Sequence, residues 1–213
     1  MKNFLIHKMF SVIAFAALAG ITVGSAYGQG PKLVADKPTF DDLQSPEFTG
    51  GGKQKPFKPK NWLEIEVKLN IPSGGGAKAK VCERLTMKWF VAVKSPDKPN
   101  MMMLLTKDVE HVNIPYDEDV YCSVYLSPVS VKRITGSDRA GKGSVEAVGY
   151  EVLVNGVKVA TESAGRGRAG WWNEPSDKIA RTETVPLLNK AETPFRAMWW
   201  DRYAEVSEGR GSR

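Results

Sequence analysis

The residues with the spacing needed for nucleotide chemistry lie between Gly136 and Gly143. Glycines at 136 and 141 followed by Lys142 match most of a phosphate-binding loop. That loop needs a hydroxyl after the lysine to hold magnesium, and Gly143 stands there instead. It also needs a following helix whose N-terminus faces the phosphates, whereas the next residues alternate as a strand does. We therefore expect a flexible loop here and no nucleotide site.

The remaining polar residues do not predict a hydrolase active site or a metal site. His111 is the one histidine beyond residue 28, and a serine or cysteine hydrolase needs such a base to be held by a third group. We expect His111 to face solvent on a strand. The acidic run 117–119 lacks the regular ligand spacing of a calcium loop, and we expect a solvated turn there. The sequence thus assigns no catalytic residue, no metal ligand and no cofactor.

Cys82 and Cys122 are the two cysteines of the chain. In an exported protein such a pair favours a disulfide. The bridge would close a ring of 41 residues, for which chain entropy gives a stabilisation of about 4 kcal/mol. The alternative is two separate buried thiols. Two cysteines without neighbouring histidines do not make a zinc site.

The residues most typical of a binding surface are Arg166, Arg168, Trp171 and Trp172, which follow one another in a glycine-rich run. Arginine and tryptophan are enriched in binding hot spots, so this patch is a candidate contact for an anionic polymer, a sugar or a protein partner. The alternative is that a tryptophan fills the end of a sandwich while the arginines stay solvated. In the pair Trp199–Trp200 we expect one core and one outward ring, because adjacent residues of a strand point in opposite directions.

The first 28 residues have the layout of a secretory signal peptide. Lys2 and Lys8 give a basic start, 9–21 is mostly apolar, and Ala26 and Gly28 supply small residues at a cleavage site. The alternative is an amphipathic or buried N-terminal helix. Cleavage would lower the net charge from +6 to +4 and leave no transmembrane segment. We expect an exported protein, periplasmic, outer-membrane-associated or at the cell surface, and nucleic acid is not an expected partner.

Composition then divides the exported chain. Residues 29–60 are rich in proline, glycine and lysine and predict an extended arm, and 207–213 form a polar tail. Residues 61–206 form the predicted domain. Alternation of apolar and polar residues predicts strands within 63–71, 85–93, 120–126, 148–154, 157–159 and 195–203, with weaker candidates at 101–114 and 129–134.

The Asn155-Gly156 pair between two alternating runs is a strong hairpin signal, because both residues tolerate positive φ. Seven or more short strands with frequent turns predict an all-β fold, an antiparallel immunoglobulin-like β-sandwich with an extended N-terminal arm.

A family resemblance rests on the export signal, the basic arm and the segments 62–67, 170–172 and 197–201. Together they resemble a family of verrucomicrobial pilus-like proteins, which are secreted immunoglobulin-like proteins encoded near type IV pilus-type genes. The resemblance implies a surface-associated, non-enzymatic role in a pilus-like assembly and brings no catalytic residues. A type IV pilin precursor has a glycine before its cleavage point and a glutamate five residues later, whereas here Lys8 precedes Met9 and the fifth residue is Ile13. A pilus-associated β domain therefore fits better than a shaft subunit.

These observations predict an exported, non-enzymatic interaction or structural protein of a pilus-like or cell-surface assembly, with protein partners. The alternative is a secreted carbohydrate-binding module that uses exposed tryptophans, with glycans as partners.

Overall fold

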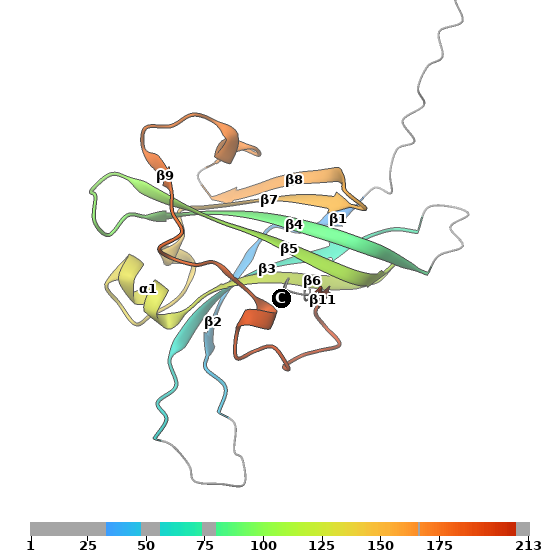
Figure 1. Ribbon diagram of the computed structural model, residues 1–213, viewed down its shortest axis with the longest axis horizontal. Coiled ribbons are helices and arrows are strands. Elements are labelled where there is room, and N and C mark those ends of the chain that lie inside the picture. Colours follow the sequence, from blue (N-terminus) through green and yellow to red (C-terminus); the bar gives the residue numbers. More distant parts are fainter. Residues whose placement is uncertain (1–32, 48–55, 74–79, 166, 208–213) are drawn as a thin grey trace, which may run out of the picture.

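Two sheets packed face to face make up the body of the protein (Figure 1). The computed structural model describes residues 33–47, 56–73, 80–165 and 167–207. Sheet A consists of β1 (Val34–Ala35), β2 (Thr39–Gln44), β3 (Asn61–Asn70), β6 (Asp119–Leu126) and β10 (Leu188–Asn189). Sheet B consists of β4 (Val81–Lys94), β5 (Met102–Pro115), β7 (Ala147–Val154), β8 (Val157–Gly165), β9 (Ile179–Arg181) and β11 (Glu205–Val206). Within the described residues every strand pair is antiparallel except β5 with β9. The predicted all-β sandwich is confirmed.

Alternation in β3 and β4 fills the core between the sheets, because a period of two places every second side chain on the inner face. The fully buried inner side chains of these two strands are Leu63, Ile65, Val67, Leu69, Leu85, Met87, Trp89, Val91 and Val93. Tyr150 from β7 packs its ring 5.8 Å from Trp89. The outer face of β3 departs from this scheme, since Glu64 and Glu66 are only 3% and 5% exposed.

The Asn155-Gly156 hairpin is confirmed. Both residues have positive φ, of 48° and 83°, and they join β7 to β8. The weak strand candidate at 129–134 is wrong, because these residues lie in the helix α1 (Pro128–Thr135). The side chain of Ser127 caps this helix by accepting a hydrogen bond from the backbone of Ser130, and Gly136 ends it with φ 72°.

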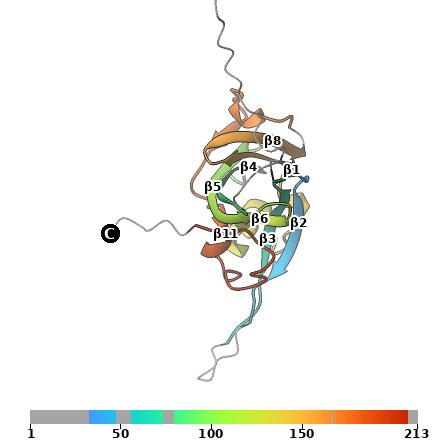
Figure 2. The same ribbon diagram turned by 90° about the vertical axis from the view of Figure 1, so that its right-hand side faces the viewer.

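The C-terminal segment, residues 179–207, joins the two sheets along one side of the sandwich (Figures 1 and 2). It pairs first with β5 through β9, then with β6 through β10, again with β6 through a bridge between Tyr121 and Tyr203, and last with β5 through β11. Between these contacts lies a 3₁₀ turn, η3 (Lys190–Glu192). The strand predicted over 195–203 is wrong: this stretch is a series of turns.

The sandwich begins earlier than predicted, because β1 and β2 pair with β3 along one edge of sheet A. The predicted arm 29–60 is thus partly built into the fold. The β2–β3 ribbon projects from the body in Figure 1, and exposed residues 56–60 lead into it. The predicted signal peptide, the remainder of the arm and nearly all of the polar tail lie outside the described residues. No helix of the described part is long and apolar enough to cross a membrane.

The predicted disulfide is absent from the structure, where Cys82 and Cys122 are free, buried thiols. They lie on different sheets, Cys82 beside Ile114 in sheet B and Cys122 beside Val67 in sheet A. Cys82 Sγ instead donates to the carbonyl of Arg84 at 3.3 Å. Burial raises the pKa of both thiols, so neither is a reactive nucleophile.

Candidate functional site

The tryptophans predicted to contact partners are buried. Trp171 and Trp172, in the 3₁₀ turn η2 (Trp171–Asn173), are 8% and 5% exposed. Trp172 stacks on Phe90 with ring centroids 4.6 Å apart and lies directly over Gly149, where a Cβ would come within 1.9 Å of the indole. The two rings thus form a small second core on the outer face of sheet B. The alternative of one tryptophan at the end of the sandwich is therefore met only in part: both rings are buried, and they cover a face of sheet B.

The described arginine of the same patch, Arg168, lies at the surface in an ion pair, with its side chain 82% exposed. Arg168 donates two hydrogen bonds, of 2.8 and 2.7 Å, to Glu174. Arg166 lies outside the described residues. Among the described residues of the predicted site, the two tryptophans are therefore buried while Arg168 stays at the surface.

His111 is buried rather than solvent-facing, with an exposed fraction of 2%. It lies on β5 opposite Val206 of the neighbouring strand β11. Its Nδ1 donates to the carbonyl of Ala204 at 3.2 Å. Its Nε2 is buried without a hydrogen-bond partner. Burial lowers the pKa of His111 to about 4, so the ring is neutral at neutral pH and lies away from solvent.

The glycine-rich loop after α1 lacks the strand-loop-helix setting of a phosphate-binding loop. It follows the C-terminal end of a helix at Gly136 and leads through the 3₁₀ turn η1 (Lys142–Ser144) into β7. No helix N-terminus of the kind that holds a phosphate comes after it.

A polar network on the outer face of sheet A is the most unusual feature of the structure. Arg202, from the C-terminal segment, donates to both carboxylate oxygens of Glu66, at 2.6 and 2.7 Å. The hydroxyls of Tyr125 and Tyr203 both donate to Glu64 Oε1. Because buried carboxylates need such partners, this network explains why two glutamates tolerate burial on β3.

Charge and aromatic contacts support the network from both sides. The guanidinium of Arg202 lies 3.6 Å from the centroid of the Tyr121 ring, and Lys190 Nζ lies 4.5 Å from that of Tyr203. Burial raises the pKa of Glu66 and lowers that of Lys190. Burial also raises the pKa of Tyr203, which keeps its hydroxyl a hydrogen-bond donor.

Trp199 and Trp200 stand exposed above this network, at 46% and 63%. The expectation of one core ring and one outward ring is wrong, because they lie in a turn and not on a strand. Trp199 adopts φ 51°, which a bulky side chain rarely does. Its ring stacks 6.2 Å from Phe195, which in turn stacks 5.6 Å from the buried Tyr125. A stack of rings thus fixes Trp199 from the interior outwards.

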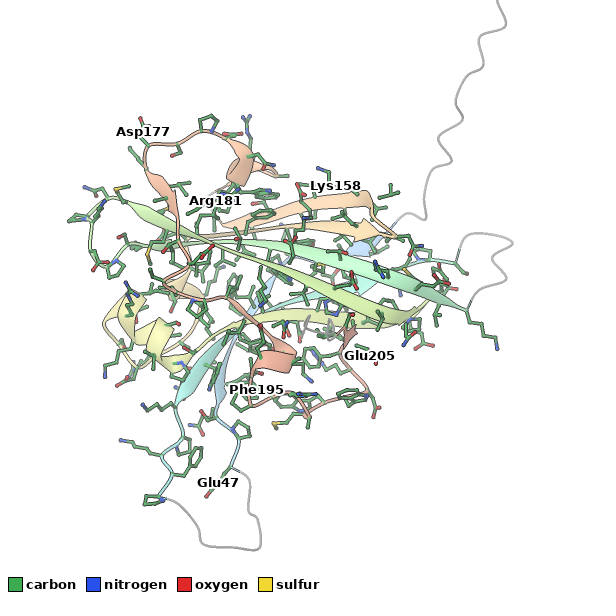
Figure 3. The ribbon with its side chains drawn as sticks, viewed as in Figure 1. Glu47, Lys158, Asp177, Arg181, Phe195 and Glu205 are labelled. Atoms are coloured by element: carbon green, nitrogen blue, oxygen red, sulfur yellow. The ribbon has the colours of Figure 1, made fainter. Side chains whose placement is uncertain are left out.

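The two tryptophans border neighbouring hollows, and together with these hollows we call them the tryptophan surface. The hollow beside Trp199 is lined by Asp41, Leu43, Glu64, Glu66, Trp199, Arg202 and Tyr203. That beside Trp200 is lined by Lys190, Ala191, Arg196, Trp200, Tyr203, Ala204, Glu205 and Val206. Phe195, whose ring stacks on that of Trp199, is labelled in Figure 3. In this view it lies in the C-terminal segment, above Glu47, which follows β2. Within the described residues, no group of histidines, cysteines and acids could hold a metal ion.

The sequence reasoning missed Glu64, Glu66 and Arg202 because their positions carried ordinary signals. Alternating acids on a strand indicate a solvated face, and the covering segment comes more than 130 residues later. The adjacent tryptophans Trp199 and Trp200 could have indicated an exposed aromatic site. The prediction of a strand there placed one of the two rings in the core, whereas both are exposed.

The model of a pilus-like protein family matches residues 24–210. A solved structure from Akkermansia muciniphila is 40% identical and superposes with a TM-score of 0.77, covering 83% of this chain and 93% of its own. A comparison with curated proteins gives no match.

The fold and the site define a β-sandwich protein that carries two exposed tryptophans beside a buried polar network. The chain belongs to the verrucomicrobial pilus-like protein family that its sequence resembled. That family is a structural, pilus-type family and not a known enzyme family.

Proposed function

We propose that the protein is an exported, non-enzymatic component of a pilus-like or cell-surface assembly and that it binds a protein neighbour through the tryptophan surface. Family membership supports the pilus-like role. The predicted leader supports export to the periplasm, the outer membrane or the cell surface.

The observation that carries the proposal is the pair of exposed rings Trp199 and Trp200 on a segment fixed by buried contacts. Adjacent large apolar side chains that are exposed to solvent mark interaction sites. Tryptophan and arginine are also enriched among the residues that carry most of the binding energy of protein interfaces. Rings that are already held in place lose little conformational entropy on binding. The proposed binding surface is therefore on the C-terminal segment and not at the predicted patch around Trp171, whose ring is buried.

The carbohydrate alternative depends on exposed tryptophans, and two of its candidates are buried. Trp171 and Trp172 cannot stack on a sugar while they fill the second core on sheet B. No observation favours a sugar over a protein at Trp199 and Trp200.

Site-specific cross-linking in cells tests the proposal. A photo-reactive amino acid at position 200 should cross-link to another protein of the surface assembly. The same group at Val157, which is 66% exposed at the β7–β8 turn, is the matched control and should give no such product. Identical products from both positions, or none from position 200, would overturn the proposal.

A further inference from the structure

The exposed segment that leads into β3 has the composition of a docking peptide. Residues 56–60 read Pro-Phe-Lys-Pro-Lys, and all five are exposed, with Phe57 at 49%. Two prolines three positions apart favour the polyproline conformation, which aromatic-lined grooves recognise at low entropic cost. We call residues 56–60 the basic segment.

The lysines of the basic segment are available for a partner. Lys58 and Lys60 form no ion pair among the described residues. They border a hollow with Lys132 and Arg133 of α1, whose charges are partly offset by Asp138 and Asp97. Mutual repulsion among these cations favours an acidic partner.

The hollow beside Trp199 has the complementary chemistry. Of the carboxylates in its lining, Glu66 is paired with Arg202 and Glu64 accepts from the two tyrosine hydroxyls, whereas the side chain of Asp41 is exposed and open to a cation. The exposed ring of Trp199 offers a face for an ammonium group. This combination of aromatic walls with the exposed carboxylate of Asp41 suits a lysine-flanked polyproline segment.

The basic segment of one molecule does not reach its own hollow. Asp41 pairs with Glu64, and Gln44 pairs with Asn61, so the ribbon runs away from the hollow towards residue 60. Lys58 lies six residues before Glu64 on an extended chain, which places it about 20 Å away. The backbone of Ser45 holds this direction by donating to the carbonyl of Lys60.

We propose that the hollow beside Trp199 binds the basic segment of a second copy of this chain. In this contact a lysine of the segment lies against Asp41 and the face of Trp199, while Phe57 packs against the exposed rings. The inference rests on the proposed function and names the neighbour as another copy. Because the two surfaces are different patches, each molecule can in principle donate one contact and accept another.

Sedimentation velocity of the purified full chain over a range of concentrations tests this contact. The wild type should self-associate, and the association should weaken as salt is raised, since the contact pairs exposed charges. The hollow variant Asp41→Asn/Trp199→Ala and the segment variant Lys58→Glu/Lys60→Glu should each weaken self-association by about tenfold or more. The control Lys98→Glu/Lys178→Glu makes the same change of net charge at exposed residues elsewhere and should behave as wild type.

Mixing the two variants gives the decisive result. The hollow variant keeps an intact basic segment, and the segment variant keeps an intact hollow, so the mixture should associate more strongly than either variant alone. Circular dichroism of each variant verifies that it is folded. A wild type that stays monomeric at every concentration, a segment variant that associates normally, or a mixture without association would overturn the inference. None of these results would affect the position-200 cross-links, so failure here is distinguishable from failure of the proposed function.

Discussion

Arg202 donates hydrogen bonds of 2.6 and 2.7 Å to the carboxylate of Glu66, which lies 136 residues earlier in the chain. The carboxylate side is almost fully buried, whereas the arginine side chain keeps 42% exposure. This pair fixes the turn that carries Trp199 onto the outer face of sheet A. The stability of the fold and the shape of the tryptophan surface therefore depend on the same interaction.

Replacement of this arginine should be costly. In Arg202→Met the apolar stem remains, but Glu66 is left buried without its charged partner. We expect the free energy of unfolding to fall by about 2–3 kcal/mol, below the range for a fully buried pair because one partner is half exposed. Urea denaturation measures the change.

The matched control for this variant is Arg84→Met, whose side chain is 61% exposed and lies 3.6 Å from Glu110. An exposed pair of this kind contributes less than about 1 kcal/mol. Equal losses in the two variants would show that Arg202 does not hold the segment.

Acid should destabilise the fold through His111. Its pKa is about 4 in the folded chain because it is buried and about 6.5 when unfolded. Between these values the unfolded state binds more protons, so stability is full above pH 6.5 and declines as pH falls towards 4. The decline attributable to His111 is at most about 3 kcal/mol.

Comparison of stability curves isolates this effect, because Glu66 has a raised pKa and contributes with the opposite sign. His111→Leu should lose the hydrogen bond to Ala204 at every pH, but its stability should fall less between pH 6.5 and 4 than that of the wild type. Parallel curves for the two proteins would contradict the assignment.

Gly149 should not tolerate a side chain. In Gly149→Ala the new Cβ would meet the ring of Trp172 at 1.9 Å, so the indole must leave its place on Phe90. We expect a loss of about 1–3 kcal/mol and a red shift of tryptophan fluorescence. Gly143→Ala, where nothing lies within 4 Å, is the control and should change neither quantity. An unshifted spectrum for Gly149→Ala would mean that Trp172 is not packed there.

The inner faces of the strands could be predicted from sequence because they depend on local alternation. Leu63 and Leu85 belong to such patterns, and Asn155-Gly156 specifies its turn by itself. The outer faces could not be predicted in this way, because the residues that cover them come from segments remote in sequence. Glu64 looks like a solvated residue until Tyr203 is placed over it.

The same non-local cause accounts for the buried tryptophans. Trp172 is buried because Gly149, on the remote strand β7, leaves room for its ring. The helix α1 has a local cause instead. Its apolar residues Val131 and Ile134 are three apart, and Ser127 followed by Pro128 is a helix-start signal that strand alternation does not take into account.

The thiols should be inaccessible in the folded protein. A thiol reagent should label neither Cys82 nor Cys122 under native conditions, since both are at most 1% exposed. In denaturant without reductant it should label two thiols per chain, because the structure has both cysteines free. No labelling in denaturant would instead support the disulfide expected from the sequence.

Substitutions of Trp199 can distinguish an effect on stability from an effect on binding. The strained backbone of this residue lowers the stability of the fold, whereas the stacking of its ring on Phe195 raises it. Trp199→Asn loses a stacking contact worth about 0.5–1.5 kcal/mol but relieves the strain of φ 51°, since asparagine tolerates the left-handed region. Its free energy of unfolding should stay within about 1 kcal/mol of the wild type. Trp199→Ala loses the same stacking without that relief and should be the less stable of the two.

Both Trp199 variants should nevertheless lose the position-200 cross-link to the same extent, because both lack the ring. Chemical denaturation and cross-linking of the pair measure the two effects side by side. If cross-linking followed stability, so that Trp199→Asn retained it and Trp199→Ala did not, the ring would be a structural element of the turn and not a contact.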